Sequence, residues 1–193
     1  MIDLQQSGDL RSDPFAHTTA QDLLPLELAS FALSWMETAA PWKLRIASFY
    51  EQWELHLDGD SLPSQVRALC ARSTIERLSN VMLKPLTAAT LVLTEVTAHK
   101  LVAGQTIRLH NDHLDGAETH RLVVQLNRGW DDEQGGMLML FSGPSPEEVC
   151  RIIRPVHRSA LAFPISPRSF HAVSTIRTGE RYTLVYSFRE TTH

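Results

Sequence analysis

The feature that most constrains the fold of this chain is a series of short β-rich runs in its second half. No segment between neighbouring runs is long enough for a crossover helix, so adjacent strands are expected to be antiparallel. Turn residues such as Gly135-Gly136 and Thr178-Gly179 separate the runs. The pattern predicts an antiparallel sandwich or barrel, and a double-stranded β-helix, or jelly roll, of about eight antiparallel strands fits the number of runs. The runs cover residues 91–102, 106–110, 120–127, 137–141, 150–156, 160–165, 170–176 and 181–188.

The residues before this region have a different pattern, which predicts a helical support region over residues 20–88. Apolar side chains at three- and four-residue steps predict one helix over 21–39 and two more over about 63–86. Residues 44–57 alternate in part and are expected to be extended. Polar residues 1–19 are expected to form a loose N-terminal arm.

With 193 residues, the chain is long enough for one domain with its own core. We therefore expect a single, mainly β domain with N-terminal helices. Residues 89–190 would form the jelly-roll core, and the helices would cover one face of its sheet.

Charge and composition exclude several classes of partner. The formal net charge is −4, whereas nucleic-acid binders usually carry a basic excess, so no nucleic-acid partner is expected. No apolar run approaches the roughly 18 residues of a membrane span, so no membrane partner is expected either. The first residues do not resemble a secretory signal, and the two cysteines, Cys70 and Cys150, do not make a disulfide framework. A cytoplasmic location is the resulting expectation.

Three segments of the chain read His-x-Asp, and strand geometry favours one of them as a metal site. Residues i and i+2 of a strand point to the same side, so a histidine and an aspartate at that spacing can reach one ion. His110 ends an alternating strand, and Asp112 continues its side. The other two segments, 56–58 and 113–115, run into a turn or lie further into a loop.

The last two β runs contribute a third candidate metal ligand and an arginine suited to bind an anion. His171 lies in the seventh run, which neighbours the second in a jelly roll. Two histidines and one carboxylate would form a facial triad with open coordination sites, as in iron(II) oxygenases. Arg181 opens the last run on the same face as Thr183. A guanidinium inside a barrel needs an anion, and its two-pronged geometry suits a carboxylate.

At this point the chain resembles the iron(II)/2-oxoglutarate-dependent dioxygenases, in their prolyl-hydroxylase-like branch. The resemblance covers about residues 90–190 and rests on three motifs in order. IRLHND is similar to the family's His-x-Asp strand, and VVQLNRGWDDEQGGMLMLF to the following strand, loop and Gly-Gly turn. SPRSFHAVSTIRTGERYTLVYSF is similar to its distal histidine, a ten-residue gap and an arginine on the final strand.

The resemblance implies roles for individual residues. His110, Asp112 and His171 would be the metal-binding and catalytic residues, and Arg181 would hold the distal carboxylate of 2-oxoglutarate. Thr183 would add a hydroxyl contact to the cosubstrate. Gln125 stands where the family often has tyrosine near that carboxylate. The implied cofactors are iron(II), 2-oxoglutarate and dioxygen, with ascorbate in a supporting role.

The implied reaction is hydroxylation of an unactivated C–H bond, with release of succinate and carbon dioxide. An amino-acid-like, peptide or carrier-bound substrate is expected, and Arg108 and Arg121 are the candidate substrate contacts. Two alternatives remain: a cupin-like metal-binding isomerase or lyase, and a non-redox jelly roll that only binds a ligand. Arg181 and its spacing from His171 favour the oxygenase.

Overall fold

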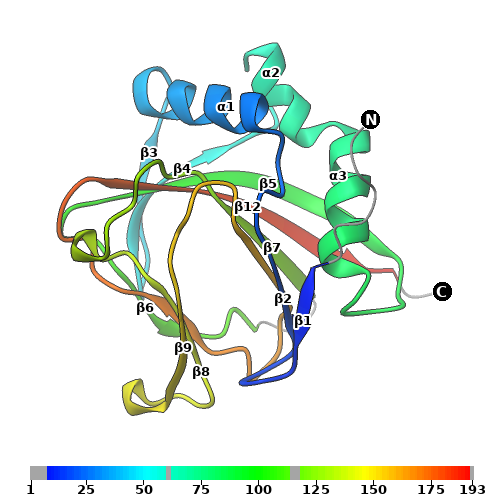
Figure 1. Cartoon of the computed structure of the whole chain (residues 1–193), viewed down its shortest axis with the longest axis vertical. Coiled ribbons are helices and arrows are strands. Elements are labelled where there is room, and N and C mark those ends of the chain that lie inside the picture. Colours follow the sequence, from blue (N-terminus) through cyan, green and yellow to red (C-terminus); the bar gives the residue numbers. More distant parts are fainter. Residues whose placement is uncertain (1–7, 60–61, 114–117, 192–193) are drawn as a thin grey trace.

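The computed structural model describes residues 8–59, 62–113 and 118–191. Its strands form two antiparallel sheets that enclose an interior between them (Figure 1). The larger sheet has eight strands in the order β1-β2-β10-β7-β12-β5-β4-β3, and the smaller has four in the order β6-β11-β8-β9. Four strands of each sheet, β10-β7-β12-β5 and β6-β11-β8-β9, are the eight runs of the predicted jelly roll. The fold class is therefore confirmed.

The strand bounds follow the predicted runs closely in the second half of the chain. The strands are β1 (Asp9–Arg11), β2 (His17–Ala20), β3 (Lys43–Ile46), β4 (Glu51–His56), β5 (Leu91–Val102), β6 (Ile107–His110), β7 (His120–Gln125), β8 (Leu138–Phe141), β9 (Val149–Ile153), β10 (Ala160–Pro164), β11 (His171–Val173) and β12 (Glu180–Glu190). The α-helices are α1 (Leu26–Thr38), α2 (Ser64–Arg67) and α3 (Arg72–Leu78). Single turns of other helix types are η1 (Ala68–Cys70), η2 (Ser79–Leu83), η3 (Asp132–Gln134) and η4 (Pro146–Glu148).

The N-terminal region differs from expectation because two short segments of it join the larger sheet. Within the described part of the predicted loose arm, β2 pairs with β10 and β1 pairs with β2. The Thr18 hydroxyl also donates to the carbonyl of Met82 at 2.6 Å. The arm prediction is thus wrong for these residues. The extended segment predicted over residues 44–57 is confirmed, because β3 and β4 form a hairpin that extends the sheet at its other edge.

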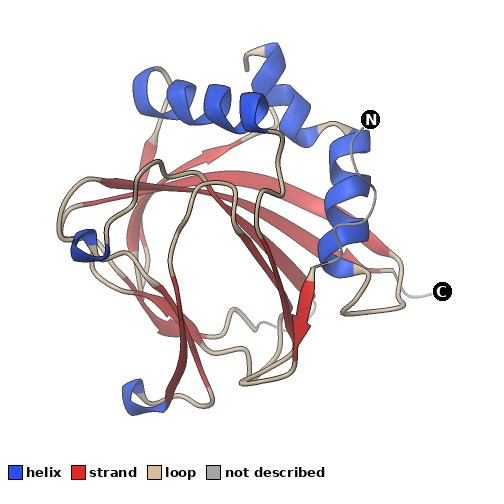
Figure 2. Cartoon of the chain, viewed as in Figure 1, coloured by secondary structure: helices blue, strands red, loops and turns tan. Residues whose placement is uncertain are grey.

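Helices α1, α2 and α3 gather on one face of the larger sheet, as expected (Figure 2). Helix α1 begins after Pro25, whose fixed φ suits a helix start, and its buried residues recur at helical spacing: Ala29, Ala32, Leu33 and Met36. Their packing against the sheet removes apolar surface from water, which stabilises the fold by about 1.5–3 kcal/mol for each large aliphatic side chain. No helix in the described ranges is long and apolar enough to cross a membrane.

Strand β12 separates two cores because its side chains alternate between the two faces of the sheet. Tyr182, Leu184, Tyr186 and Phe188 point outward and belong to the core shared with the helices. Arg181, at the other parity, points into the space between the sheets. The second core lies there and includes Leu101, Leu140, Leu161, Phe163 and Val173. One strand therefore anchors the helices and also lines the interior.

Candidate active site

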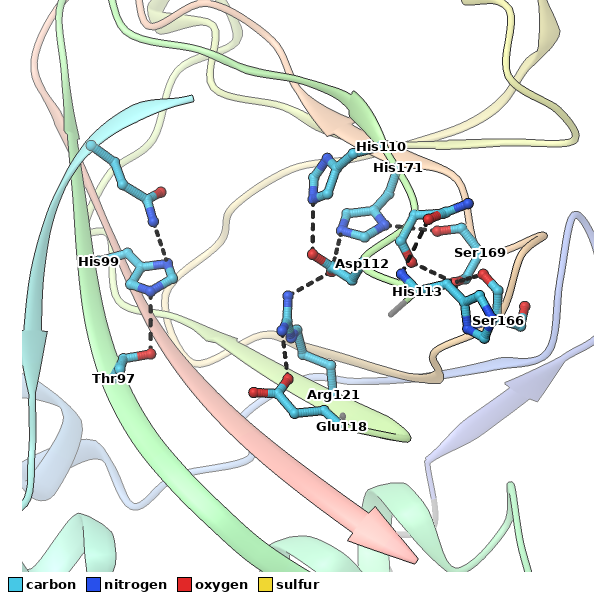
Figure 3. A network of polar contacts seen from close by, with 12 residues as sticks. Thr97, His99, His110, Asp112, His113, Glu118, Arg121, Ser166, Ser169 and His171 are labelled. Atoms are coloured by element: carbon cyan, nitrogen blue, oxygen red, sulfur yellow. Dashed lines mark hydrogen bonds and ion pairs between the residues drawn. The ribbon is translucent and has the colours of Figure 1, made fainter. Parts of the chain in front are cut away.

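Pairing between β6 and β11 brings together two histidines that lie far apart in the sequence. His110 and His171 are direct Cα partners in this pair. Asp112 follows the end of β6 in the left-handed region, with φ of 60°, and its carboxylate lies between the two rings (Figure 3). Nε2 of His110 is 3.2 Å from Oδ1 of Asp112, and Nε2 of His171 is 3.2 Å from Oδ2. These three side chains offer ligand atoms within 4.8 Å of one another.

Backbone carbonyls hold both imidazoles by their far nitrogens. Nδ1 of His110 is 2.8 Å from the carbonyl oxygen of Arg108, and Nδ1 of His171 is 2.8 Å from that of Ser169. A carbonyl oxygen only accepts hydrogen bonds, so Nδ1 of each ring carries a proton. Nε2 of each ring then faces the cluster, which is the orientation that metal-binding histidines have.

The Asp112 carboxylate is ionised in this environment. Burial would raise the pKa of Asp112, but hydrogen bonds with His110 and His171 and the charge of Arg121 outweigh it and hold the pKa well below its usual range. Two neutral imidazoles and one carboxylate are the donor set of the iron(II) facial triad. The chemistry and spacing of the three side chains therefore fit iron(II).

The two other His-x-Asp segments do not join this cluster. His56 instead lies 3.4 Å from a carboxylate oxygen of Glu95, at the exposed end of β4. His113 is not among the three clustered donors, and Asp115 lies outside the described residues. Among the residues that the structure places, His110, Asp112 and His171 are the one group suited to hold a metal ion.

Arg181 is a buried cation on the wall formed by β12. Its side chain is almost fully enclosed, with 3% of the residue exposed. One guanidinium nitrogen donates to the Thr183 hydroxyl at 2.9 Å, and that hydroxyl donates to Oε1 of Gln125 at 3.2 Å. Nε of Arg181 has no hydrogen-bond partner within the described ranges. Burial lowers the pKa of Arg181 to about 10, so the group remains charged at neutral pH.

An unpaired buried guanidinium calls for an anionic ligand. No described carboxylate forms an ion pair with Arg181, and a buried charge without a partner is costly. Thr183 and Gln125 are Cα partners on neighbouring strands, so the predicted cosubstrate contacts lie side by side. A carboxylate at Arg181 would satisfy both Nε and the charge. The interior thus fits a dicarboxylate such as 2-oxoglutarate.

The turn at Gly135-Gly136 packs directly behind this arginine. Both glycines have positive φ, 72° and 66°, which other residues rarely adopt. A Cβ on Gly136 would lie 2.6 Å from Cδ1 of Ile176 and 3.1 Å from Cδ of Arg181. The backbone can approach Arg181 this closely only because no side chain intervenes.

The two predicted substrate arginines have different surroundings. Arg108 is exposed and donates to the carbonyl of Ser48 at 2.6 Å. This hydrogen bond holds the segment before β4 against β6. In the same segment, the Phe49 ring stacks on His110 with centroids 4.3 Å apart. Arg121 instead points into the interior and contacts two carboxylates, those of Asp112 and Glu118 (Figure 3).

His99 on β5 is an interior residue that sequence patterns did not indicate. It is a Cα partner of Thr183, so both side chains lie on the inner wall. Nδ1 of His99 is 3.3 Å from the Gln52 amide, and Nε2 is 3.2 Å from the Thr97 hydroxyl. Figure 3 shows His99 across the interior from Asp112. The one sequence signal for this position was its two-residue spacing from Thr97 on β5, which puts both side chains on the same face of the strand.

The buried His99 makes a pH-dependent contribution to stability. Burial lowers its pKa to about 4, against 6.5 in the unfolded chain. As pH falls below 6.5, the unfolded state takes up a proton before the folded state does, so the free energy of unfolding decreases. When pH falls from 7.5 to 4.5, the free energy of unfolding should therefore decrease less in His99→Gln than in the unaltered protein. The expected difference is roughly 2–3 kcal/mol, measured by urea unfolding. Equal losses in both proteins would contradict the buried, neutral state of His99.

The combination of a jelly roll, a two-histidine-one-carboxylate cluster and a buried arginine defines a class of protein, the non-haem iron oxygenases that use a 2-oxo acid. Comparison with known families agrees with this class. Residues 96–188 match the family model described as the 2OG-Fe(II) oxygenase superfamily. This match and the clustered donors identify the protein as a 2-oxoglutarate-dependent oxygenase whose cofactors are iron(II), 2-oxoglutarate and dioxygen.

Solved structures with the same fold include prolyl hydroxylases. A prolyl-4-hydroxylase from Pseudomonas putida is 18% identical with a TM-score of 0.70, and the match covers 91% of this chain and 92% of that one. A Trichoplax adhaerens prolyl hydroxylase, in complex with a hypoxia-inducible factor peptide fragment, is 14% identical with a TM-score of 0.71, covering 90% and 83%. A viral collagen prolyl hydroxylase from Paramecium bursaria Chlorella virus-1, in a 2-oxoglutarate complex, is 14% identical with a TM-score of 0.63, covering 91% and 96%. No curated protein sequence matches the chain.

Proposed function

We propose that this oxygenase hydroxylates an unactivated C–H bond of a peptide, amino-acid-like or carrier-bound substrate. His110, Asp112 and His171 hold iron(II), and Arg181 holds the distal carboxylate of 2-oxoglutarate, assisted by Thr183 and Gln125. When bound, the iron and cosubstrate couple dioxygen reduction to hydroxylation, with release of succinate and carbon dioxide.

The protein residues contribute positioning and charge in this reaction. The carbonyls of Arg108 and Ser169 orient the two imidazoles, so that both Nε2 atoms face one point. Arg181 neutralises one end of the cosubstrate and thereby fixes where its other end lies. The apolar residues between the sheets limit the access of water to the interior.

The observation that carries this proposal is the unpaired, buried Arg181 in the same interior as the three clustered donors. Arg181 and its ten-residue spacing from His171 favour the oxygenase over a cupin-like isomerase or lyase and over a jelly roll that only binds a ligand. Support for a peptide substrate comes from the fold, which resembles prolyl hydroxylases over about nine tenths of the chain. The Trichoplax relative was solved with a peptide, and a peptide is the substrate class that we favour here.

Two measurements test the proposal. Anaerobic addition of iron(II) and 2-oxoglutarate should give a weak visible charge-transfer band, because the cosubstrate chelates the metal. Succinate release should then be screened against proline-containing peptides, free amino acids and carrier-bound amino acids, with the strongest stimulation expected from a peptide. If the metal binds but 2-oxoglutarate gives neither a band nor succinate, the oxygenase proposal fails and the cupin-like alternative is favoured.

A further inference from the structure

Arg121 occupies an unusual place for a positive charge, directly beside a residue of the clustered donors. It lies on β7 and is a Cα partner of Ser187 on β12 and of Phe163 on β10. The interior core contains Phe163, so this face of β7 looks inward. The Arg121 side chain is 23% exposed. It is thus a mostly enclosed cation in the wall of the active site.

Both ends of the Arg121 guanidinium are already bound to carboxylates. One terminal nitrogen donates to Oδ2 of Asp112 at 2.5 Å, and the other donates to Oε2 of Glu118 at 2.6 Å. Two negative charges therefore neutralise one positive charge. A group in this state has little remaining attraction for an anionic substrate, because such a substrate would have to displace one of the two carboxylates.

The Asp112 carboxylate depends on side-chain contacts for its orientation. Asp112 lies two residues beyond the end of β6, so the ladder of backbone hydrogen bonds does not include it. Its left-handed φ turns the side chain back between the two imidazoles. Arg121 donates to Oδ2, which also lies 3.2 Å from Nε2 of His171, whereas Oδ1 lies 3.2 Å from Nε2 of His110 and has no contact with the guanidinium. The guanidinium contact thus makes the two oxygens inequivalent.

We propose that Arg121, held from its far side by Glu118, is a positioning residue that makes Asp112 a one-oxygen ligand. This inference rests on the proposed role of Asp112 as a metal ligand. A carboxylate that binds iron(II) through both oxygens would occupy an extra coordination position. A one-oxygen ligand beside two imidazoles leaves three of six positions open, which a chelating cosubstrate and dioxygen together require.

Metal affinity distinguishes this role from a simple charge effect, because the two predict opposite changes in affinity when Arg121 is replaced. Removing a positive charge near a divalent ion should strengthen metal binding if only charge matters. If Arg121 positions Asp112, Arg121→Met should weaken binding by about 10- to 100-fold, as for other groups that orient metal ligands. Arg121→Lys keeps the charge but not the two-pronged donor, and should weaken binding several-fold.

The experiment is an anaerobic titration of the full chain with cobalt(II), whose visible absorption reports the ligand arrangement. Weaker binding and an altered spectrum in both variants are expected, with Arg189→Met, an exposed arginine on β12, as the matched control. Unchanged or tighter binding in Arg121→Met would overturn the inference. If Arg121→Met does not fold, Arg121→Lys alone provides the test. A cobalt(II) affinity and spectrum of Arg121→Lys equal to those of the unaltered protein would then overturn the inference. Failure of the unaltered protein to bind cobalt(II) would instead refute the proposed metal site.

Discussion

Replacing Asp112 with alanine should abolish iron(II) binding and, with it, succinate formation. Asp112 supplies the one anionic donor of the cluster, and it lies 3.2 Å from the ring nitrogens of both His110 and His171. Disturbing groups that merely orient a metal ligand costs about 10- to 100-fold in affinity, so loss of the ligand itself should exceed 100-fold. His110→Ala and His171→Ala should have comparable effects. Anaerobic iron(II) titration measures this, with circular dichroism as the check of folding.

The neighbouring His-x-Asp segment provides the control for this prediction. His113→Ala removes an imidazole three residues along the chain from His110, outside the clustered donors, and should leave iron(II) affinity unchanged. Asp115→Ala should behave in the same way. If iron(II) binding needs His113 and Asp115 but tolerates loss of His110 and Asp112, the metal site has been assigned to the wrong pair.

Replacing Arg181 with glutamine should raise the concentration of 2-oxoglutarate required for activity by about 30- to 700-fold. Glutamine can still donate a hydrogen bond, but it leaves the distal carboxylate without a countercharge in an enclosed site. An orphaned buried charge of this kind costs about 2–4 kcal/mol, and about 1.4 kcal/mol corresponds to a factor of ten. The measurement is the dependence of succinate formation, and of the anaerobic visible band, on 2-oxoglutarate concentration.

Arg177 is a suitable control for the Arg181 prediction because it lies only four residues earlier but is exposed. Arg177→Gln should keep the ordinary cosubstrate requirement. Iron(II) affinity without cosubstrate should be similar in both variants, because neither residue belongs to the three clustered donors. An Arg181→Gln protein with an unchanged 2-oxoglutarate requirement would exclude Arg181 from the cosubstrate site.

Sequence patterns predicted the parts of the site that strand alternation controls. The two faces of β12 follow directly from a period of two, so Arg181 and Thr183 could be placed inside and Tyr182 and Leu184 outside. The proximity of His110 and His171 followed from the neighbouring positions of two strands in a jelly roll, and their Cα pairing agrees. Both predictions use only backbone geometry.

Side-chain partners and edge strands could not be predicted in this way. Alternation places Arg121 on the inner face. It does not show that Asp112 and Glu118 already occupy its two terminal nitrogens, because those contacts depend on how a loop returns to β7. Strands β1 and β2 are only three and four residues long. Such short segments have little intrinsic β signal, and they are ordered here by pairing with β10 and with each other.

The two-sided nature of β12 also limits how the enzyme can change. A substitution at Leu184 or Tyr186, made to improve packing against the helices, would also displace the backbone that carries Arg181 and Thr183. Substitutions in this strand therefore affect cosubstrate binding and the packing of the helices together. Diversification toward new substrates is expected to arise in segments such as the one that presents Phe49 over His110, whose residues can vary without disturbing either core.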